Sequence, residues 1–200
     1  MTPPRLVVLI SGGGRTLLNL AEAIEGGRLH AVIARVIASR ADAAGVARAR
    51  AAGLPVGVLS PRDFPDRGAF DAALTAALAA ERPDLVILAG WLLRLTVPPQ
   101  LAGRVLNIHP ALLPRHGGAG MYGARVHAAV LAAGDAESGC SVHVVDEHYD
   151  HGPLLAQSRV PVLPGDTAET LAARVFAAEC RTYPAAIAAY ARTLPARGAD

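Results

Sequence analysis

Lysine is absent from this chain, because all nineteen basic residues are arginine. Without lysine there is no Schiff-base nucleophile and no attachment point for pyridoxal phosphate. The phosphate loop of P-loop NTPases, which needs its lysine, is excluded as well. A bound anion must therefore be held by arginine, by backbone amides or by the positive end of a helix. The net charge of +2 gives no electrostatic reason to expect nucleic acid as a partner.

Cysteine is scarce, and long apolar runs are missing. The two cysteines, Cys140 and Cys180, are too few for a disulfide framework or a cysteine-based zinc site. No apolar segment approaches the roughly 18 residues that a membrane-spanning helix needs. The amino terminus runs straight into a strand pattern and lacks the features of a signal peptide. We therefore expect a cytoplasmic protein with no membrane partner, either a monomer or a homodimer.

Strand and helix patterns alternate through the first half of the chain. Apolar runs rich in β-branched residues and leucine are typical of buried parallel strands, and right-handed crossovers join them. Strands are predicted at 5–10, 31–38, 55–59, 84–89 and 104–108, and helices at 17–27, 41–52 and 68–81, with a loop at 61–67. The alternation predicts an α/β, Rossmann-like fold with a mostly parallel central sheet and helices on both faces.

The second half departs from this alternation. Residues 117–123 form a glycine-rich loop, and a helix is predicted at 125–133. Two apolar or alternating segments, 138–145 and 153–162, predict an antiparallel strand pair. Asp166 and Thr167 then cap a helix that we expect to run to about residue 178, to break near Pro184 and to resume to Arg192. No linker separates these parts, so we expect one domain over residues 1–200.

A glycine turn follows the first predicted strand. Ser11 and the residues Gly12, Gly13, Gly14, Arg15 and Thr16 separate that strand from a helical pattern. A strand, a glycine turn and a helix in this order aim backbone amides and a positive helix end at an anion. The spacing matches neither the dinucleotide fingerprint nor the P-loop, so a simple phosphate is the favoured ligand. A tight turn without a ligand is the alternative.

Three polar side chains are the candidates for catalysis. Asn107 and His109 lie at the carboxyl end of a buried strand and are followed by a rigid turn between Pro110 and Pro114. Ligands of open α/β sheets bind at this edge. An amide and an imidazole can both donate to an oxygen that becomes negative in a transition state. The carboxylate of Asp150 would raise the pKa of the histidine and order a water. The set fits direct acyl or formyl transfer to an amine.

Two other chemistries have weaker support. His143, His148 and His151 with nearby carboxylates contain metal-ligand types, but their spacing has no clear geometric rationale, so we expect no metal in the active site. Ser11 and Ser141 do not lie in a nucleophile elbow, which argues against a serine hydrolase.

Five segments together resemble a known family. They are LVVLISGGG, LAGW, LNIHPALLP, SVHVVDEHYDHGP and VPVLPGDTAETLAARVFAAE, in this order. They are similar to segments of the phosphoribosylglycinamide formyltransferases, which belong to the folate-dependent formyltransferase family. The resemblance covers nearly the whole chain. His151 stands where these proteins often have glycine.

The resemblance implies a function and a set of site residues. The expected reaction transfers a formyl group from 10-formyltetrahydrofolate to the amine of glycinamide ribonucleotide in purine biosynthesis, without a metal. It implies a phosphate-binding half (1–100) and a catalytic and folate-binding half (101–200). The implied residues are Asn107, His109 and Asp150 for catalysis, the 12–16 turn and Glu179 for the ribonucleotide, and Arg67, Leu92, Leu93, Val145 and Asp146 for the folate.

Three alternatives stay open at the level of sequence. The chain could hydrolyse formyltetrahydrofolate to formate, which uses similar groups but admits water in place of the acceptor. It could transfer the formyl group to another amine. A non-catalytic phosphate sensor would leave Asn107, His109 and Asp150 without a role.

Overall fold

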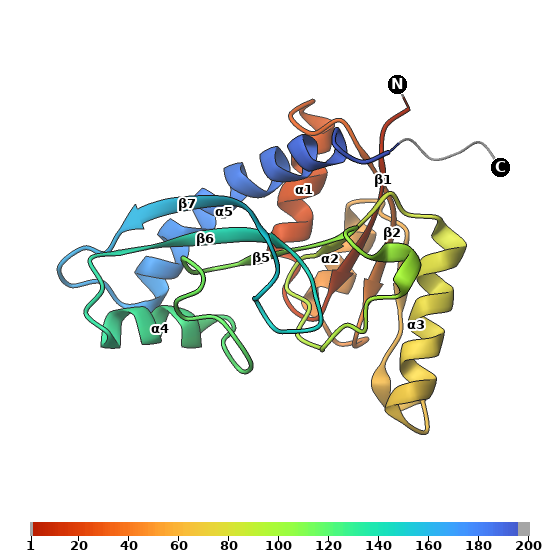
Figure 1. Ribbon diagram of the computed structural model, residues 1–200, viewed down its shortest axis with the longest axis horizontal. Helices are drawn as coiled ribbons and strands as arrows, with labels where there is room; N and C mark the ends of the chain where they lie inside the picture. The colour runs from red at the N-terminus through yellow and green to blue at the C-terminus, as the bar shows by residue number, and fades with distance from the viewer. Residues whose placement is uncertain (1, 196–200) are drawn as a thin grey trace.

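The predicted alternation of strands and helices builds one twisted sheet (Figure 1). The computed structural model describes residues 2–195. Its strands are β1 (Arg5–Ile10), β2 (Val32–Ala38), β3 (Val56–Val58), β4 (Leu85–Leu88), β5 (Val105–His109), β6 (Glu137–Val144) and β7 (Leu154–Pro161). They lie in the order β3-β2-β1-β4-β5-β6-β7. Strands β1 to β5 are parallel, and β6 and β7 pair antiparallel, so the expected α/β fold is confirmed.

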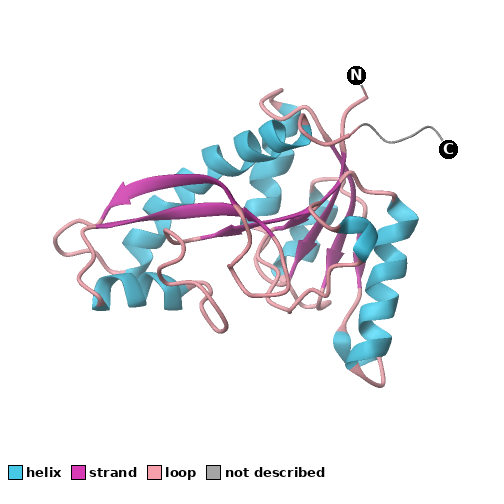
Figure 2. Cartoon of the chain, in the orientation of Figure 1, coloured by secondary structure: helices cyan, strands magenta, loops and turns pink. Residues whose placement is uncertain are grey.

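Helices cover both faces of the sheet (Figure 2). They are α1 (Arg15–Glu25), α2 (Ala44–Ala51), α3 (Arg67–Glu81), α4 (Ala124–Ala132) and α5 (Ala168–Ala191), with short 3-10 turns at Pro61–Asp63 and Pro99–Leu101. Alternate side chains of a strand point to opposite faces. Leu6, Val8 and Ile10 of β1 therefore pack with α1, α2 and α5, whereas Val7 and Leu9 pack with α3.

Element boundaries differ from the sequence-based expectation mainly at two turns. The helix predicted at 41–52 begins only at Ala44, because residues 41–42 form a turn in which Arg40 and Asp42 make an ion pair. The segment 61–67, expected to be a loop, contains a 3-10 turn and the first residue of α3, whose N-cap Asp66 accepts from the Ala69 amide.

The predicted break near Pro184 is wrong, because α5 continues without interruption to Ala191. Proline has no N–H, so it leaves the carbonyl four residues earlier without its helical partner. That carbonyl belongs to Cys180. The side-chain amide of Asn19, in α1, donates to it over 3.2 Å. A buried residue of a neighbouring helix therefore replaces the missing donor. The predicted cap is confirmed, since Thr167 and Thr170 form a capping box.

Tyr183 connects α5 to the two central strands β4 and β5. Its hydroxyl lies 3.1 Å from the Leu88 carbonyl oxygen and 3.0 Å from that of Leu106. The side chain is fully buried, and burial raises the pKa of the phenol. One hydroxyl thus links the last residue of β4 to the neighbouring strand β5. Among the described residues, no helix has the length and apolar character that a bilayer crossing requires.

Candidate active site

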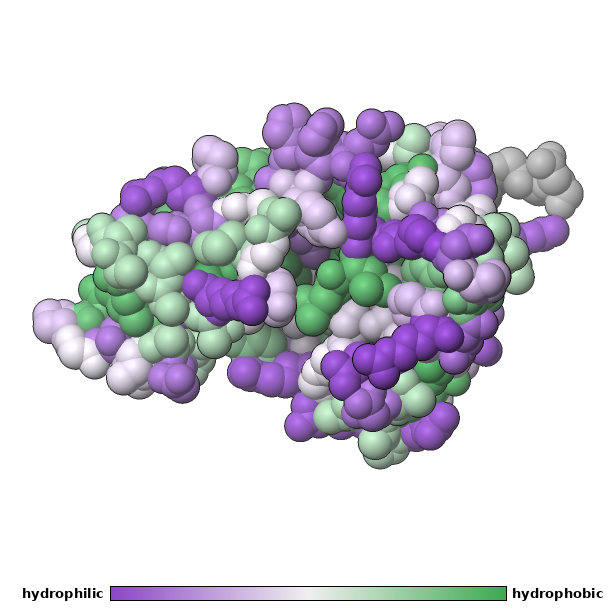
Figure 3. All heavy atoms as spheres, turned by 90° about the horizontal axis from the view of Figure 1, so that it is seen from below, coloured by the Kyte–Doolittle hydropathy of each residue, from purple (hydrophilic) through white to green (hydrophobic). Residues whose placement is uncertain are grey.

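A pocket of about 310 Å³ opens at the carboxyl ends of β4 and β5. Small-molecule sites occupy roughly 300–1,000 Å³, and open α/β sheets place them at this edge. The segments after β4 and β5, the glycine-rich loop and the loop between β6 and β7 line it, together with Thr16 and Glu179. Seen from below, this face has a central hollow with apolar side chains, surrounded by hydrophilic ones (Figure 3).

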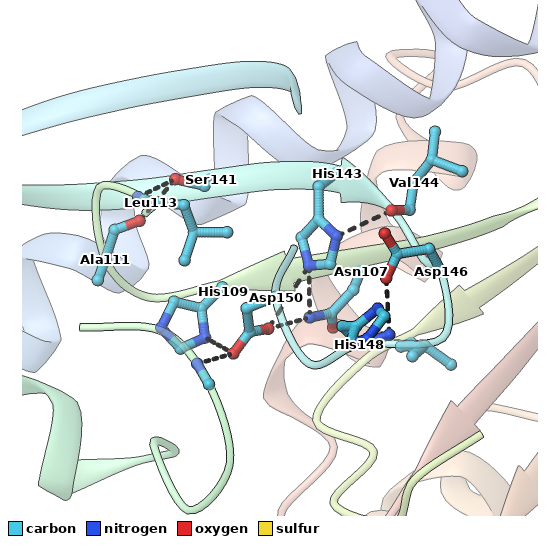
Figure 4. A network of polar contacts seen from close by, with 12 residues as sticks. Asn107, His109, Ala111, Leu113, Ser141, His143, Val144, Asp146, His148 and Asp150 are labelled. Carbon is cyan, nitrogen blue, oxygen red and sulfur yellow. Dashed lines mark hydrogen bonds and ion pairs between the residues drawn. The ribbon is translucent and has the colours of Figure 1, made fainter. Parts of the chain in front are cut away.

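The three predicted catalytic side chains meet in this pocket (Figure 4). Asn107 and His109 are two residues apart on β5, so they share one face of the strand. Asp150 comes from the loop between β6 and β7. Its Oδ2 lies 3.4 Å from Nδ1 of His109, and its Oδ1 accepts from Nδ2 of Asn107 over 3.3 Å. The His109 and Asp150 side chains are only 4% and 9% exposed.

Left-handed backbone places the groups that hold this cluster. Asp150 has a φ of 54° and His116 one of 56°, values that are uncommon for residues other than glycine. Nε2–H of His109 donates to the His116 carbonyl over 2.8 Å, and the Gly118 amide donates to Oδ2 of Asp150 over 3.0 Å. A Cβ on Gly152 would overlap the carbonyl oxygen of Val144, so only glycine closes the loop after Asp150.

Burial and the neighbouring charges act in opposite directions on the pair. Burial raises the pKa of Asp150, but its contacts with the His143 and His109 rings and with the Gly118 amide outweigh burial and hold that pKa below its usual value. Burial lowers the pKa of His109 below 6.5, and the attraction of Asp150 opposes this shift only in part. Asp150 therefore raises the pKa of His109 as expected, but the net pKa is lowered and not raised, because desolvation of the imidazolium is the larger effect.

His143 completes the polar cluster from β6. Its Nδ1 lies 3.0 Å from the Val144 carbonyl oxygen, which requires a proton on Nδ1. In the neutral ring Nε2 then accepts from Nδ2 of Asn107, over 3.1 Å. The same Nε2 lies 3.5 Å from Asp150, a longer contact that would need a second proton. We therefore assign His143 as the acceptor that orients the Asn107 amide.

Glu179 and Thr16 also line the pocket. Glu179, in α5, is 8% exposed, and burial raises the pKa of its carboxyl to about 7, with partial opposition from Arg15. The Arg15 guanidinium lies over the Phe176 ring, 3.8 Å from its centroid, and does not line the pocket. With a pKa near neutral pH the carboxyl is partly ionised, and its carboxylate form can accept a proton from a bound ammonium group.

The glycine turn lies beside the pocket and is held by α2. The Gly12 carbonyl accepts from the Gly45 amide over 3.0 Å, and the Gly13 carbonyl accepts from Arg48 over 2.5 Å. Gly14, the N-cap of α1, has a φ of 72°, and a Cβ there would lie 2.8 Å from the Gly45 Cα. Of the five predicted turn residues, only Thr16 lines the pocket; Gly12, Gly13, Gly14 and Arg15 do not.

Four of the five predicted folate residues line the pocket. Leu92 and Leu93 follow β4, and Val145 and Asp146 begin the loop after β6. Leu92 is 48% exposed, an apolar surface that a planar ring could cover. Its amide donates to the Ser11 hydroxyl over 3.0 Å, which ties the loop after β4 to the end of β1.

Arg67, the fifth of these residues, lies outside the wall of the pocket. It forms an ion pair of 2.6 Å with Asp71 and donates to the carbonyl of Arg94. Arg94 itself lines the pocket. Arg67 therefore contacts the site through the backbone of Arg94.

Sequence reasoning missed several lining residues. Trp91, Arg94 and Tyr149 line the pocket, and so does the whole segment 118–123. The glycines of that segment predicted a loop but gave no sign that it covers the site. His143 was read only as a possible metal ligand, because its distance from Asn107 depends on the β5–β6 register, in which the two residues are partners.

The comparisons with known proteins agree on one family. The model of the formyl transferase family matches residues 4–187. Phosphoribosylglycinamide formyltransferase of Mycobacterium tuberculosis is 44% identical over 192 residues, which cover 94% of this chain and 86% of that protein. The Escherichia coli enzyme of the same name is 38% identical over 189 residues, covering 93% and 86%.

Longer relatives contain the same segment as a small part. The trifunctional purine biosynthetic protein adenosine-3 of Drosophila pseudoobscura is 43% identical over 188 residues, but the match spans only 13% of its length. In Drosophila melanogaster the corresponding share is 14%. This chain therefore corresponds to a minor part of those proteins.

Solved structures show the same fold at full length. Glycinamide ribonucleotide transformylase 1 from Symbiobacterium toebii has a TM-score of 0.88 at 41% identity, covering 98% of this chain and 92% of that one. Phosphoribosylglycinamide formyltransferase from Brucella melitensis has a TM-score of 0.86 at 42% identity, covering 98% and 100%. With the family match over residues 4–187, these similarities show that the chain belongs to the formyl transferase family.

Proposed function

We propose that this chain transfers a formyl group from 10-formyltetrahydrofolate to the amine of glycinamide ribonucleotide, in purine biosynthesis. The observation that carries the proposal is the meeting of Asn107, His109 and Asp150 in one pocket at the carboxyl end of β5. These groups supply two hydrogen-bond donors and a carboxylate, and none is a covalent nucleophile. The names of the relatives support the same acceptor and the transfer of a formyl group.

The reaction proceeds by direct attack. The acceptor amine forms a bond with the formyl carbon, and the formyl oxygen becomes negative. Asn107 and protonated His109 stabilise that oxygen. The bond between the formyl carbon and N10 of the folate then breaks, and the proton lost by the amine passes to N10 through water held by Asp150. The products are the formamide and tetrahydrofolate, and the scheme uses no metal.

The free structure indicates what substrate binding must change. Both hydrogens of the Asn107 amide are engaged, one by His143 and one by Asp150. The formyl oxygen has to take one of them. The lowered pKa of His109 makes its imidazolium a stronger acid, and a developing oxyanion beside it favours its protonation. His109 is thus suited to become protonated as the transition state forms.

The two substrates approach from opposite sides of the cluster. The ribonucleotide phosphate binds at the 12–16 turn, at the amino end of α1, and its amine approaches Glu179. The folate lies against Leu92, Leu93 and the loop at Val145 and Asp146. Both halves, 1–100 and 101–200, therefore contribute to one site, in support of a single formyltransferase domain.

A two-substrate assay tests the proposal. The purified chain is incubated with 10-formyltetrahydrofolate carrying a labelled formyl group, with and without glycinamide ribonucleotide. We expect the label in formylglycinamide ribonucleotide only when the acceptor is present. Label released as formate without an acceptor would instead indicate the hydrolase. Label that stays in the folate under both conditions would contradict a catalytic role.

A further inference from the structure

Three potential metal ligands meet on the loop between β6 and β7, apart from the reacting groups. Asp146, His148 and His151 each offer one ligand atom, and these atoms all lie within 4.8 Å of one another. Across residues 2–195, this is the one group of three histidine, cysteine or acidic side chains that comes together in this way. His143, which sequence spacing grouped with the other two histidines, belongs to the Asn107 cluster instead.

The carboxylate of Asp146 already holds both histidines in place (Figure 4 shows Asp146 and His148). Its Oδ1 accepts from the backbone amide of His148 over 2.8 Å, and its Oδ2 lies 2.9 Å from Nδ1 of His151. The two imidazole rings meet edge to face, with centroids 5.4 Å apart. One short loop thus brings the three ligand side chains together without any ion.

The ligand types select the class of ion. Two imidazoles and one carboxylate form the donor set of many zinc sites with an open position, whereas Ca²⁺ and Mg²⁺ prefer oxygen alone. His151 has a side chain that is 73% exposed, so water can fill the remaining positions. We propose that Asp146, His148 and His151 bind one late first-row divalent cation, of which Zn²⁺ is the representative.

The proposed ion lies at the rim of the pocket, apart from the reacting groups, and Asp146 also belongs to the surface proposed for the folate. Asp146 and His148 line the pocket, and His151 does not. Asn107 and His109 contribute nothing to the cluster. The ion would join two ends of the segment that contains Asp150 and thereby stiffen it. Because the inference concerns binding alone, it does not depend on the proposed function.

Direct metal titration tests the site. The full chain, freed of any affinity tag, is titrated with Zn²⁺ against a chromogenic chelator, and with Co²⁺ while the visible absorption is followed. We expect one ion per chain. Even outer partners of metal ligands change affinity by about 10–100-fold when mutated. His148→Gln and His151→Gln should therefore each weaken binding at least ~10-fold, while the exposed His30→Gln matches the wild type.

Two further measurements distinguish loss of the site from loss of folding. Circular dichroism shows whether each variant is folded, and the histidine ring signals of the wild-type chain show by NMR which rings respond to Zn²⁺. Shifts confined to His148 and His151 support the site without any variant. No saturable Zn²⁺ binding, wild-type affinity in both variants, or weakened binding in His30→Gln would each overturn the proposal.

Discussion

The ionisation of His109 depends on two opposing effects, desolvation and the attraction of a neighbouring carboxylate. Burial disfavours the imidazolium, and the carboxylate of Asp150, with Oδ2 3.4 Å from Nδ1, favours it. Nε2–H is already committed to the His116 carbonyl, so the neutral ring presents a bare Nδ1 to a negative oxygen. The pair is therefore fully satisfied only when the histidine is protonated. Its pKa measures how far that gain offsets desolvation.

Asp150→Asn should lower the pKa of His109 further, because it removes the attraction and preserves the shape. The proposed mechanism requires protonated His109, so the high-pH limb of activity should move to lower pH. General acid–base groups contribute about 10²–10⁴-fold, and we expect a loss of kcat in that range. NMR titration of His109 and the pH profile of kcat check the shift.

Adding His109→Ala to Asp150→Asn should reduce kcat little further, since the two residues act as a unit. If the losses of the two single variants multiplied in the double variant, the residues would act independently and this expectation would be contradicted.

Glu179→Gln should stabilise the fold at pH 8 but not at pH 4.5. The pKa of Glu179 is raised from 4.5 to about 7, so its neutral form contributes stability below pH 4.5 that is lost as the pH rises through 7. One pKa unit corresponds to about 1.4 kcal/mol, which gives a gain of about 1–3 kcal/mol at pH 8. Urea unfolding at both pH values measures it. Equal gains at both would mean better packing rather than removal of a buried charge.

At the scale of elements, the unbroken α5 depends on a residue of α1. Asn19→Ala leaves the partly buried Cys180 carbonyl without a donor, which costs about 1–3 kcal/mol. In a Pro184→Ala background, the new amide of residue 184 can bond to that carbonyl. The cost of Asn19→Ala should then be smaller. Urea unfolding of the four proteins completes the cycle, and an equal cost in both backgrounds would show that Asn19 acts in another way.

The turn before α1 is best tested at Thr16. Gly14 is unsuitable, because its positive φ and its contact with Gly45 would strain the fold. Thr16→Val keeps the shape and removes the hydroxyl. Hydrogen bonds to charged groups contribute about 1.5–3 kcal/mol. We expect KM for the ribonucleotide to rise about 10–100-fold and KM for the folate to stay nearly constant. Thr75→Val on α3 is the matched control. Equal increases in both constants would refute a phosphate contact.

The elements that sequence predicted best are those whose pattern is local. Buried runs such as 5–10 and 84–89 reveal strands directly, and period two places Asn107 and His109 on one face. The predicted break at Pro184 was wrong because the compensating donor, Asn19, lies 161 residues in the chain from Cys180, whose carbonyl it satisfies. The role of His143 was missed for the same reason, since only the β5–β6 register places it beside Asn107.

At the scale of the whole molecule, buried titratable groups change the stability of the fold in opposite directions as the pH falls from 7 to 5. Burial lowers the pKa of His109 and of His127, so the unfolded chain takes up protons first and stability falls as the pH drops below about 6.5. The raised pKa of Glu179 has the opposite effect, because the folded chain takes up a proton there first and stability rises as the pH falls. We therefore expect the urea midpoint of the wild type to change little in this range.

In the Glu179→Gln variant the contribution of the histidines should become visible. Its urea midpoint should decline from pH 7 to 5, and both proteins should lose stability below pH 4, where aspartates with lowered pKa values such as Asp146 and Asp150 are protonated. A flat profile for the variant between pH 7 and 5 would show that the buried histidines are not the cause.

The glycine that closes the loop after Asp150 has a consequence for engineering. Gly152 lies against the Val144 carbonyl, and the Val144 amide donates to the carbonyl of Pro153 over 2.9 Å, so the two ends of the loop are joined. The residues at the tip of the loop can therefore be varied while its two ends stay joined. Libraries that randomise 147–149 would change what the pocket offers a donor molecule while the carboxylate keeps its position. An insertion next to residue 152 would move the carboxylate itself.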